Sequence, residues 1–192
     1  TFVGDNAGGA TTTAGSNTAI GSDALLVNST GIGNTAVGQA ALDANTTANY
    51  NTAIGSGAAT ANTTGNELVA VGRNALAANT TGASNTAVGM RALDANTTAS
   101  YNTAVGGDAL GATTTANANT AVGYRALITN TTGASNVAIG SDTLYASTTA
   151  SNNTAVGTSA LTANTTGTSN VAVGYQAGLA VTTGTEHTLI GY

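Results

Sequence analysis

Four charged residues stand seventeen residues apart, and their alternating sign is the first chemistry that the sequence offers. They are Arg91, Asp108, Arg125 and Asp142. In a chain that repeats its structure every seventeen residues, these side chains stack in register as a ladder of opposite charges. An exposed ladder of this kind contributes about 0.2–1 kcal/mol per pair. We therefore interpret it as a modest structural feature rather than a ligand site.

The tyrosines are the second chemically versatile group, because aromatic rings can stack on sugars or on a neighbouring chain. All of them occupy positions that vary between repeats, where we expect exposed corners of the chain. One interpretation makes the rings contacts to host or surface glycans, and the other makes them covers for the corners. We favour the second interpretation. The positions are Tyr50, Tyr101, Tyr124, Tyr145, Tyr175 and Tyr192.

No arrangement of residues indicates catalysis or metal binding. His187 is the only histidine, so neither a catalytic dyad nor a histidine metal centre is expected. Asp5, Asp23, Asp43 and Asp94 are isolated and follow no calcium-loop pattern. In stacked coils Asp43 and Asp94 lie about 14 Å apart, too far to act as a carboxylate pair. We predict no enzymatic activity, no cofactor and no metal.

The composition narrows the class of protein further. Only 6% of the 192 residues are charged, against about 25% in an ordinary domain, and the net charge is −5. Three scattered arginines make no basic surface for nucleic acid. No apolar stretch approaches the roughly 18 residues that span a bilayer. The chain opens at Thr1 rather than methionine, and we expect residues 1–192 to be a single repeat array cut from a longer fibre.

A glycine recurs at every seventeenth position without one miss, and this period must position all the groups above. One backbone turn is thus repeated along the whole chain, as in a solenoid rather than a globular enzyme. We expect these glycines to supply a positive φ at a structural turn. They are Gly4, Gly21, Gly38, Gly55, Gly72, Gly89, Gly106, Gly123, Gly140, Gly157, Gly174 and Gly191.

Positions are numbered below as columns relative to this glycine, so that column −1 is the residue just before it. Column −1 is always Val or Ile, column −2 is Ala except for Phe2 and Leu189, and column +9 is always Thr. Column −4 is Asn except for Leu68 and His187, and column +4 is mostly Leu. The Thr-Ala-Val segment predicts one short strand per coil, and the Asn-Thr-Thr segment predicts a second. We expect about 11 coils, stacked in parallel and in register into a rod about 50 Å long.

The predicted core is too small for a lone rod. We expect Val or Ile of column −1 to point into its own coil together with Leu of column +4. The Asn-Thr-Thr segment faces water, and the alanine of column −2 faces another chain, because a strand that is apolar on both sides is buried on both sides. The sequence therefore predicts several rods packed side by side, most naturally as a homotrimer.

Short motifs carry a family resemblance. Asn-Val-Ala-Ile-Gly at 136–140 and Asn-Val-Ala-Val-Gly at 170–174 resemble the head repeats of YadA-like trimeric autotransporter adhesins, although that family's coil is shorter. The segment 119–127 is similar to the Asn-Thr-Ala-Val-Gly-Tyr-x-Ala-Leu arrays of phage tail fibres and bacterial surface fibres, which often end in an endosialidase-type chaperone. The resemblance implies a left-handed parallel β-roll, a homotrimer and an extracellular place on a virion tail or a cell surface.

Two functions follow as expectations. The leading one is a structural shaft or adhesive segment of a fibre, with other copies of the chain as partners and no insertion into a membrane. The alternative is an ice-binding β-solenoid that uses outward threonine columns. Columns +8 and +9 are both threonine-rich. Since adjacent residues of a strand point oppositely, we expect only one of the two columns to face out.

Overall fold

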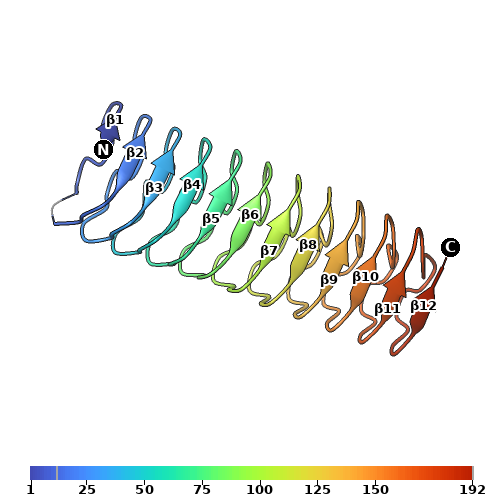
Figure 1. Ribbon diagram of the computed structural model, residues 1–192. Coiled ribbons are helices and arrows are strands. Elements are labelled where there is room, and N and C mark those ends of the chain that lie inside the picture. Colours follow the sequence, from blue (N-terminus) through green and yellow to red (C-terminus); the bar gives the residue numbers. More distant parts are fainter. Residues whose placement is uncertain (12, 192) are drawn as a thin grey trace.

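The computed structural model describes residues 1–11 and 13–191. In this part of the chain twelve short strands form one parallel sheet whose order follows the sequence. Each strand opens one coil of the rod (Figure 1). This arrangement confirms the predicted all-β parallel solenoid of seventeen-residue coils. The strands are β1 (Phe2–Val3), β2 (Thr18–Ile20), β3 (Thr35–Val37), β4 (Thr52–Ile54), β5 (Val69–Val71), β6 (Thr86–Val88), β7 (Thr103–Val105), β8 (Thr120–Val122), β9 (Val137–Ile139), β10 (Thr154–Val156), β11 (Val171–Val173) and β12 (Thr188–Ile190).

The strands pair at a constant offset of one repeat. In β6 and β7, for example, Ala87 lies beside Ala104 and Val88 beside Val105. Each residue therefore stacks on the residue of the same column in the next coil, at the strand spacing of about 4.8 Å. Features that recur every seventeen residues in the sequence become straight lines along the rod.

The second strand predicted for each coil is wrong. The Asn-Thr-Thr segments form bends and turns in the described residues. They still bond to the next coil, as Thr80 N donates to Thr97 O at 2.8 Å. The asparagine of column +7 prevents a longer extended run by closing a turn on itself. The Asn79 amide, for example, donates to the Gly82 carbonyl at 3.0 Å.

The direction in which the strand side chains point is the opposite of the prediction. Alanine of column −2 is fully buried inside the coil, as are Ala87 and Ala104, while Val105 and Ile139 of column −1 point outward and are exposed. Side chains alternate along a strand, so columns −3 and −1 share the outer face and column −2 takes the inner one. The lumen of a seventeen-residue coil is narrow. Leucine of column +4 fills it, and only a small residue fits opposite.

The repeat glycine makes the corner after each strand. Gly89 and its equivalents have φ between +118° and +139°, a region that side chains other than glycine's rarely enter. A Cβ atom on Gly89 would also lie 2.5 Å from the carbonyl oxygen of Gly106 in the next coil. Two consecutive turns follow, closed by Ala92 N to Gly89 O at 3.3 Å and by Asn96 N to Leu93 O at 3.1 Å.

The leucines of column +4 combine backbone strain with complete burial. Leu93 and Leu110 have φ of 52° and 53°, and both are inaccessible to solvent. The left-handed conformation costs a residue with a Cβ atom roughly 1–2 kcal/mol. Burial of a leucine side chain contributes about 1.5–3 kcal/mol, which offsets the strain. These leucines therefore serve both as a corner of the coil and as its core.

Two buried columns of asparagine satisfy the polar backbone inside the rod. In column +7, the Asn79 amide donates to Asn62 Oδ1 at 2.9 Å. In column −4, Asn102 N donates to Asn85 Oδ1 at 2.9 Å, and Asn85 donates to the Ala99 carbonyl. The prediction that the whole Asn-Thr-Thr segment faces water is thus wrong for its asparagine. Buried backbone groups need partners, and each amide joins its own coil to a neighbour.

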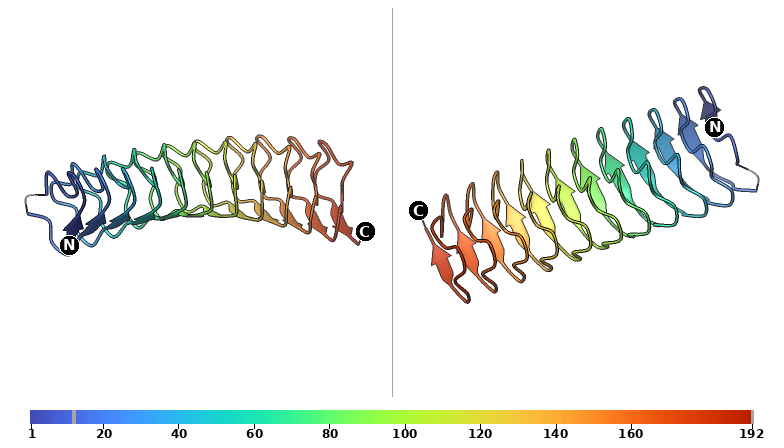
Figure 2. Two further views of the ribbon diagram at one scale, coloured as in Figure 1. Left: turned by 90° about the horizontal axis from the view of Figure 1, so that it is seen from above. Right: turned by 180° about the vertical axis from the view of Figure 1, so that it is seen from behind.

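The rod is gently arched. Seen from above, the strands follow its concave edge and the turns its convex edge (Figure 2, left). The outer face of the sheet therefore looks toward the inside of the arch. A body that contacts the strand side of the rod would therefore meet a concave surface.

Candidate functional site

The outer face of the sheet is the first candidate interaction surface. Columns −3 and −1 supply it, one with Thr or Val and the other with Val or Ile. In β9, for example, Val137 and Ile139 flank the buried Ala138. The exposed apolar side chains of these two columns are Val3, Ile20, Ile54, Val69, Val105, Ile139, Val171, Val173 and Ile190. They form a nearly uncharged stripe along the whole rod, which we call the strand face.

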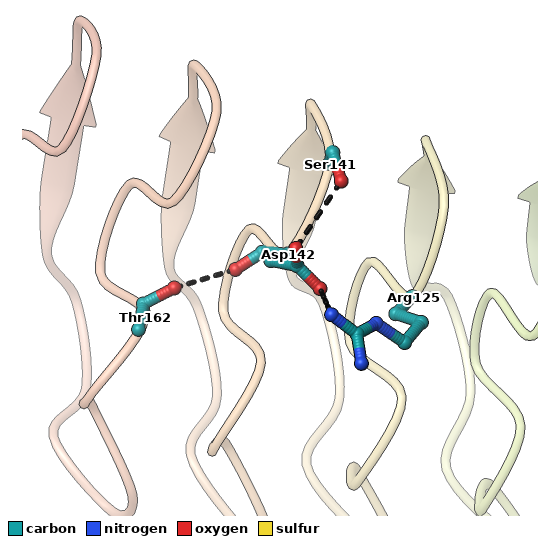
Figure 3. Close-up of polar contacts among 4 residues, drawn as sticks. All are labelled: Arg125, Ser141, Asp142 and Thr162. Atoms are coloured by element: carbon teal, nitrogen blue, oxygen red, sulfur yellow. Dashed lines mark hydrogen bonds and ion pairs between the residues drawn. The ribbon is translucent and has the colours of Figure 1, made fainter.

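The predicted charge ladder forms the second candidate, on the turn segments of the neighbouring coils. Arg91 Nη2 lies 2.8 Å from Asp108 Oδ1, and Arg125 Nη2 lies 2.8 Å from Asp142 Oδ1. The two ion pairs are separate, so the ladder consists of two rungs rather than a continuous chain. Asp142 also accepts a hydrogen bond from the Ser141 hydroxyl at 3.3 Å (Figure 3).

Two tyrosines enclose the second ion pair. The Arg125 guanidinium carbon lies 4.8 Å from the Tyr124 ring centroid and 5.1 Å from that of Tyr145. Cation–π contacts at these distances add about 0.5–1 kcal/mol each at an exposed site. The Asp142 carbonyl is held in turn by the Thr162 hydroxyl at 2.6 Å (Figure 3). Arg125 thus contacts Asp142, Tyr124 and Tyr145.

A shallow groove of about 530 Å³ runs beside these residues. It opens over Gly111, where column +5 lacks a side chain. A Cβ atom on Gly111 would lie 3.6 Å from both Asp94 Oδ1 and Ile128 Cγ1, so these two side chains border the gap. We call the site the ladder groove. Its lining comprises Arg91, Asp94, Asp108, Gly111, Ala112, Tyr124, Arg125, Ile128, Thr129 and Tyr145.

Asp94 differs electrostatically from the ladder aspartates. Partial burial raises the pKa of its carboxyl, and the nearby Asp108 raises it further, while Arg91 opposes both effects. Asp94 makes no ion pair with an arginine within the part of the chain that the structure describes. The groove therefore contains one partly desolvated carboxyl group that the ladder does not neutralise.

The raised pKa of Asp94 predicts a pH-dependent effect of the Asp94→Asn substitution. The folded protein holds the Asp94 proton to a higher pH than the unfolded chain does, so ionisation of this carboxyl opposes folding at neutral pH. We expect the variant to be more stable than the parent at about pH 7, and the difference to disappear at about pH 3, where both states are protonated. Urea unfolding of the parent and the variant at the two pH values measures this difference in stability. A difference that stays constant with pH would contradict the assignment.

The other candidate functional residues lie outside the groove. Tyr50 and Tyr101 are exposed corner residues with positive φ, and Tyr175 is exposed further along the rod. Tyr192 lies outside the described residues. His187 is exposed in the last coil. Among the described residues there is no group of three or more potential metal ligands, and no helix there could cross a membrane.

Sequence reasoning named the four ladder residues but missed the groove beside them. The missing members are Asp94, Ile128 and Tyr145 of column +5, which border the ladder across the gap at Gly111. The sequence does contain a sign of the groove. In the coils that carry the ladder, column +5 holds large or charged residues in the coils before and after the one with glycine. Only the path of the turn, which brings columns +2 and +5 to one flank, shows that they meet.

Comparison with known proteins gives no relative from which a function could be transferred. No protein-family model matches the chain, and no curated protein or solved structure is significantly similar to it. The functional argument therefore rests on the two surfaces just described.

Proposed function

We propose that this chain is a shaft or adhesive segment of an extracellular homotrimeric fibre, in which three copies pack through their strand faces. The observation that carries the proposal is the strand face itself, a row of valine and isoleucine in column −1 beside mostly threonine in column −3, which no other part of the described residues covers. A sheet that is apolar on both sides is normally covered on both sides. Exposed apolar stripes of this length mark surfaces of association.

The partner argued for is another copy of the same chain. The stripe has the seventeen-residue repeat of the rod and carries no charged side chain in columns −3 and −1. A second rod offers a complementary surface of the same length and period. The strand face also lies along the concave edge of the rod (Figure 2), where a common axis of several rods would run.

Column −3 offers a way to align the copies. It is threonine except at Val69, Val137 and Val171, which are four and then two coils apart. Only parallel copies without axial stagger place each of these valines beside its own equivalents. An antiparallel copy would reverse the uneven spacing and set valine against threonine. Mixed polar and apolar positions fix register in this way in other assemblies.

Three elements of the proposal draw on the motif resemblance rather than on the fold. These are the left-handed coil, the number of three copies and the extracellular setting on a virion tail fibre or a cell-surface appendage. The strand motif at 136–140 supports them, as does the longer motif at 119–127. A structural role also suits a rod in which two buried columns of asparagine bond one coil to the next.

The substitution Val105→Asp tests the assembly. Val105 is 36% exposed on the strand face of β7, so a lone rod tolerates aspartate there. In the trimer three carboxylates would meet at the common axis, where burying a charge without a partner is costly. We expect the parent to sediment as a trimer and the variant as a monomer with an unchanged circular dichroism spectrum. Sedimentation equilibrium measures the mass of each.

Thr98→Asp is the matched control, because Thr98 is exposed in column +9 and lies outside the strand face. We expect this variant to remain trimeric. If Val105→Asp fails to fold, Val105→Thr supplies a milder change of the same shape and should weaken association without unfolding the rod. A parent protein that stays monomeric at tens of micromolar would refute the proposal.

Ice binding is the second candidate function, and one observation favours it. The threonines of column +9 are exposed in every coil, from Thr13 to Thr183. Most hydroxyl groups of column +8 in the described residues donate to the next coil, as the Thr80 hydroxyl donates to the Thr97 carbonyl at 3.0 Å. One outward column is a narrower surface than the strand face, so we place this function second. Thermal hysteresis in cooled droplets of the parent protein would favour it over the fibre.

A further inference from the structure

We propose that the ladder groove is a binding site for a neutral oligosaccharide. This inference goes beyond a structural role in a fibre. All residues of the groove belong to one chain and none lies in columns −3 or −1. The site is therefore complete in a single rod, and it does not depend on the strand face being covered.

The groove lies in the part of the rod that carries the arginines of the protein. All three basic residues of the protein, Arg73, Arg91 and Arg125, fall in this stretch of coils. Arg73 contacts the Met90 sulfur at 3.4 Å, which extends the same flank. Elsewhere columns +2 and +5 carry alanine, serine, threonine or glycine at about half of their positions, and the others include Asp23, Asp43 and two leucines. The same ion pairs and cation–π contacts that stabilise this stretch of the rod also line the groove.

The walls of the groove are held in place before any ligand arrives. The Arg91–Asp108 and Arg125–Asp142 pairs form the charged rim, and the Arg125 guanidinium lies against the rings of Tyr124 and Tyr145. A ligand that binds between fixed groups does not have to order them, and this lowers the entropic cost of binding. Gly111 adds no side chain between Asp94 and Ile128.

The chemistry of the lining selects a neutral ligand with many hydroxyl groups. Both guanidinium groups are already paired with carboxylates, and Asp94 adds a further negative charge, so an anion is disfavoured. Hydroxyl groups can donate to the carboxylates and accept from the remaining N–H groups of the arginines. Ile128 and Tyr145 supply an apolar wall for the C–H face of a sugar ring. Burial raises the pKa of Asp94, as expected for a partly dehydrated carboxyl group that accepts hydrogen bonds from sugar hydroxyl groups.

The size of the groove also fits. Its volume of about 530 Å³ lies within the range of roughly 300–1,000 Å³ that is usual for small-molecule sites. The groove runs along the rod, where equivalent positions recur about every 4.8 Å. A short oligosaccharide lying parallel to the rod axis would place successive sugar rings against successive coils.

Titration with defined sugars tests the proposal. The probes are cellotetraose, maltotetraose, mannotetraose and chitotetraose, with tetragalacturonate as an acidic comparator. Saturation-transfer NMR and calorimetry on the intact protein measure binding. We expect at least one neutral tetrasaccharide to bind with a Kd below about 1 mM. Asp94→Ala and Tyr145→Ala should each weaken it by about tenfold or more.

Two variants control for nonspecific effects. Asp43→Ala removes a carboxylate from the same column as Asp94 but outside the groove, and Tyr101→Ala removes an exposed ring elsewhere on the rod. Both should bind the sugar as the parent does. The inference is overturned if no neutral tetrasaccharide binds, if tetragalacturonate binds best, or if Asp94→Ala and Tyr145→Ala bind unchanged. The mass of the assembly, measured separately, reports on the fibre proposal without affecting these outcomes.

Discussion

Replacing Gly106 by alanine is expected to lower the stability of the rod by at least about 3 kcal/mol. Two physical effects add. The φ of Gly106 is 131°, where a residue with a Cβ atom is strained. The new methyl group would also lie 2.5 Å from the Gly123 carbonyl oxygen and 2.6 Å from its carbon. Neither atom can move without breaking the register of the next coil. Urea unfolding followed by circular dichroism gives the size of the loss.

The neighbouring Gly107 provides a control that differs by one position. A Cβ atom there would come no closer than 3.5 Å to the Tyr124 ring, and its backbone is not in the positive-φ region. Gly107→Ala should leave stability within about 1 kcal/mol of the parent, or raise it slightly through the unfolded state. Hydrogen exchange adds a spatial test, because only Gly106→Ala should expose the amides of the coils around β7 and β8. Equal effects of the two substitutions would contradict the argument.

The sequence predicted the repeat unit because its strongest signal is local. A glycine that must adopt positive φ once per coil marks a corner, and the Thr/Val-Ala-Val/Ile segment before it marks the strand. Stacking then follows from the constant spacing alone. The register of the twelve strands in the described residues agrees with that reasoning at each pair, for example Ala121 beside Ala138.

Which side chains of the strand point into the coil could not be predicted from the same pattern. Thr-Ala-Val is compatible with either face inward, and larger side chains are usually the buried ones. The deciding factor is the width of the lumen, which depends on the two turns after the glycine. Since those turns direct Leu93 and its equivalents inward, the space opposite accepts only alanine. This information lies in tertiary geometry rather than in periodicity.

The ladder groove illustrates a second kind of limit. The seventeen-residue spacing brought Arg91 near Asp108 and Arg125 near Asp142, as stacking requires. Contacts between different columns depend on how the turn folds back, and the sequence carries no simple sign of that. Tyr145 was therefore interpreted as an isolated corner residue, although its ring lies on the Arg125 guanidinium.

The exceptions to the leucine of column +4 each stand near a larger residue of another column. Where column +4 lacks leucine, a larger residue stands nearby in another column. A Cβ atom on Gly8 would lie 2.7 Å from the Phe2 ring, and one on Gly178 would lie 2.6 Å from Leu189 Cδ1. Ala59 is the third exception, and nine residues later Leu68 replaces the asparagine of column −4. Both are buried members of the same core.

The pair Ala59 and Leu68 therefore predicts strong coupling between two substitutions. Ala59→Leu restores the common residue but overfills the coil while Leu68 is present, at a cost of about 1–3 kcal/mol. Leu68→Asn alone leaves a cavity, which lowers the free energy of unfolding by about 2–5 kcal/mol. Each hydrogen bond that the new asparagine regains reduces this loss by about 1 kcal/mol. The regained bonds would join residue 68 to Asn85 N and the Gly82 carbonyl, as Asn85 now bonds to Asn102 N and the Ala99 carbonyl.

The double variant should recover most of the loss, because it reproduces the arrangement of the other coils. We expect a coupling energy of at least about 1 kcal/mol in a double-mutant cycle measured by urea unfolding. The reverse exchange, Leu110→Ala with Asn119→Leu, transplants the exception into a regular coil and should show coupling of the same sign. Additive effects in both cycles would mean that Leu68 fills some other space. Coupling in both would show that each coil keeps a constant core volume while the residue that supplies it varies.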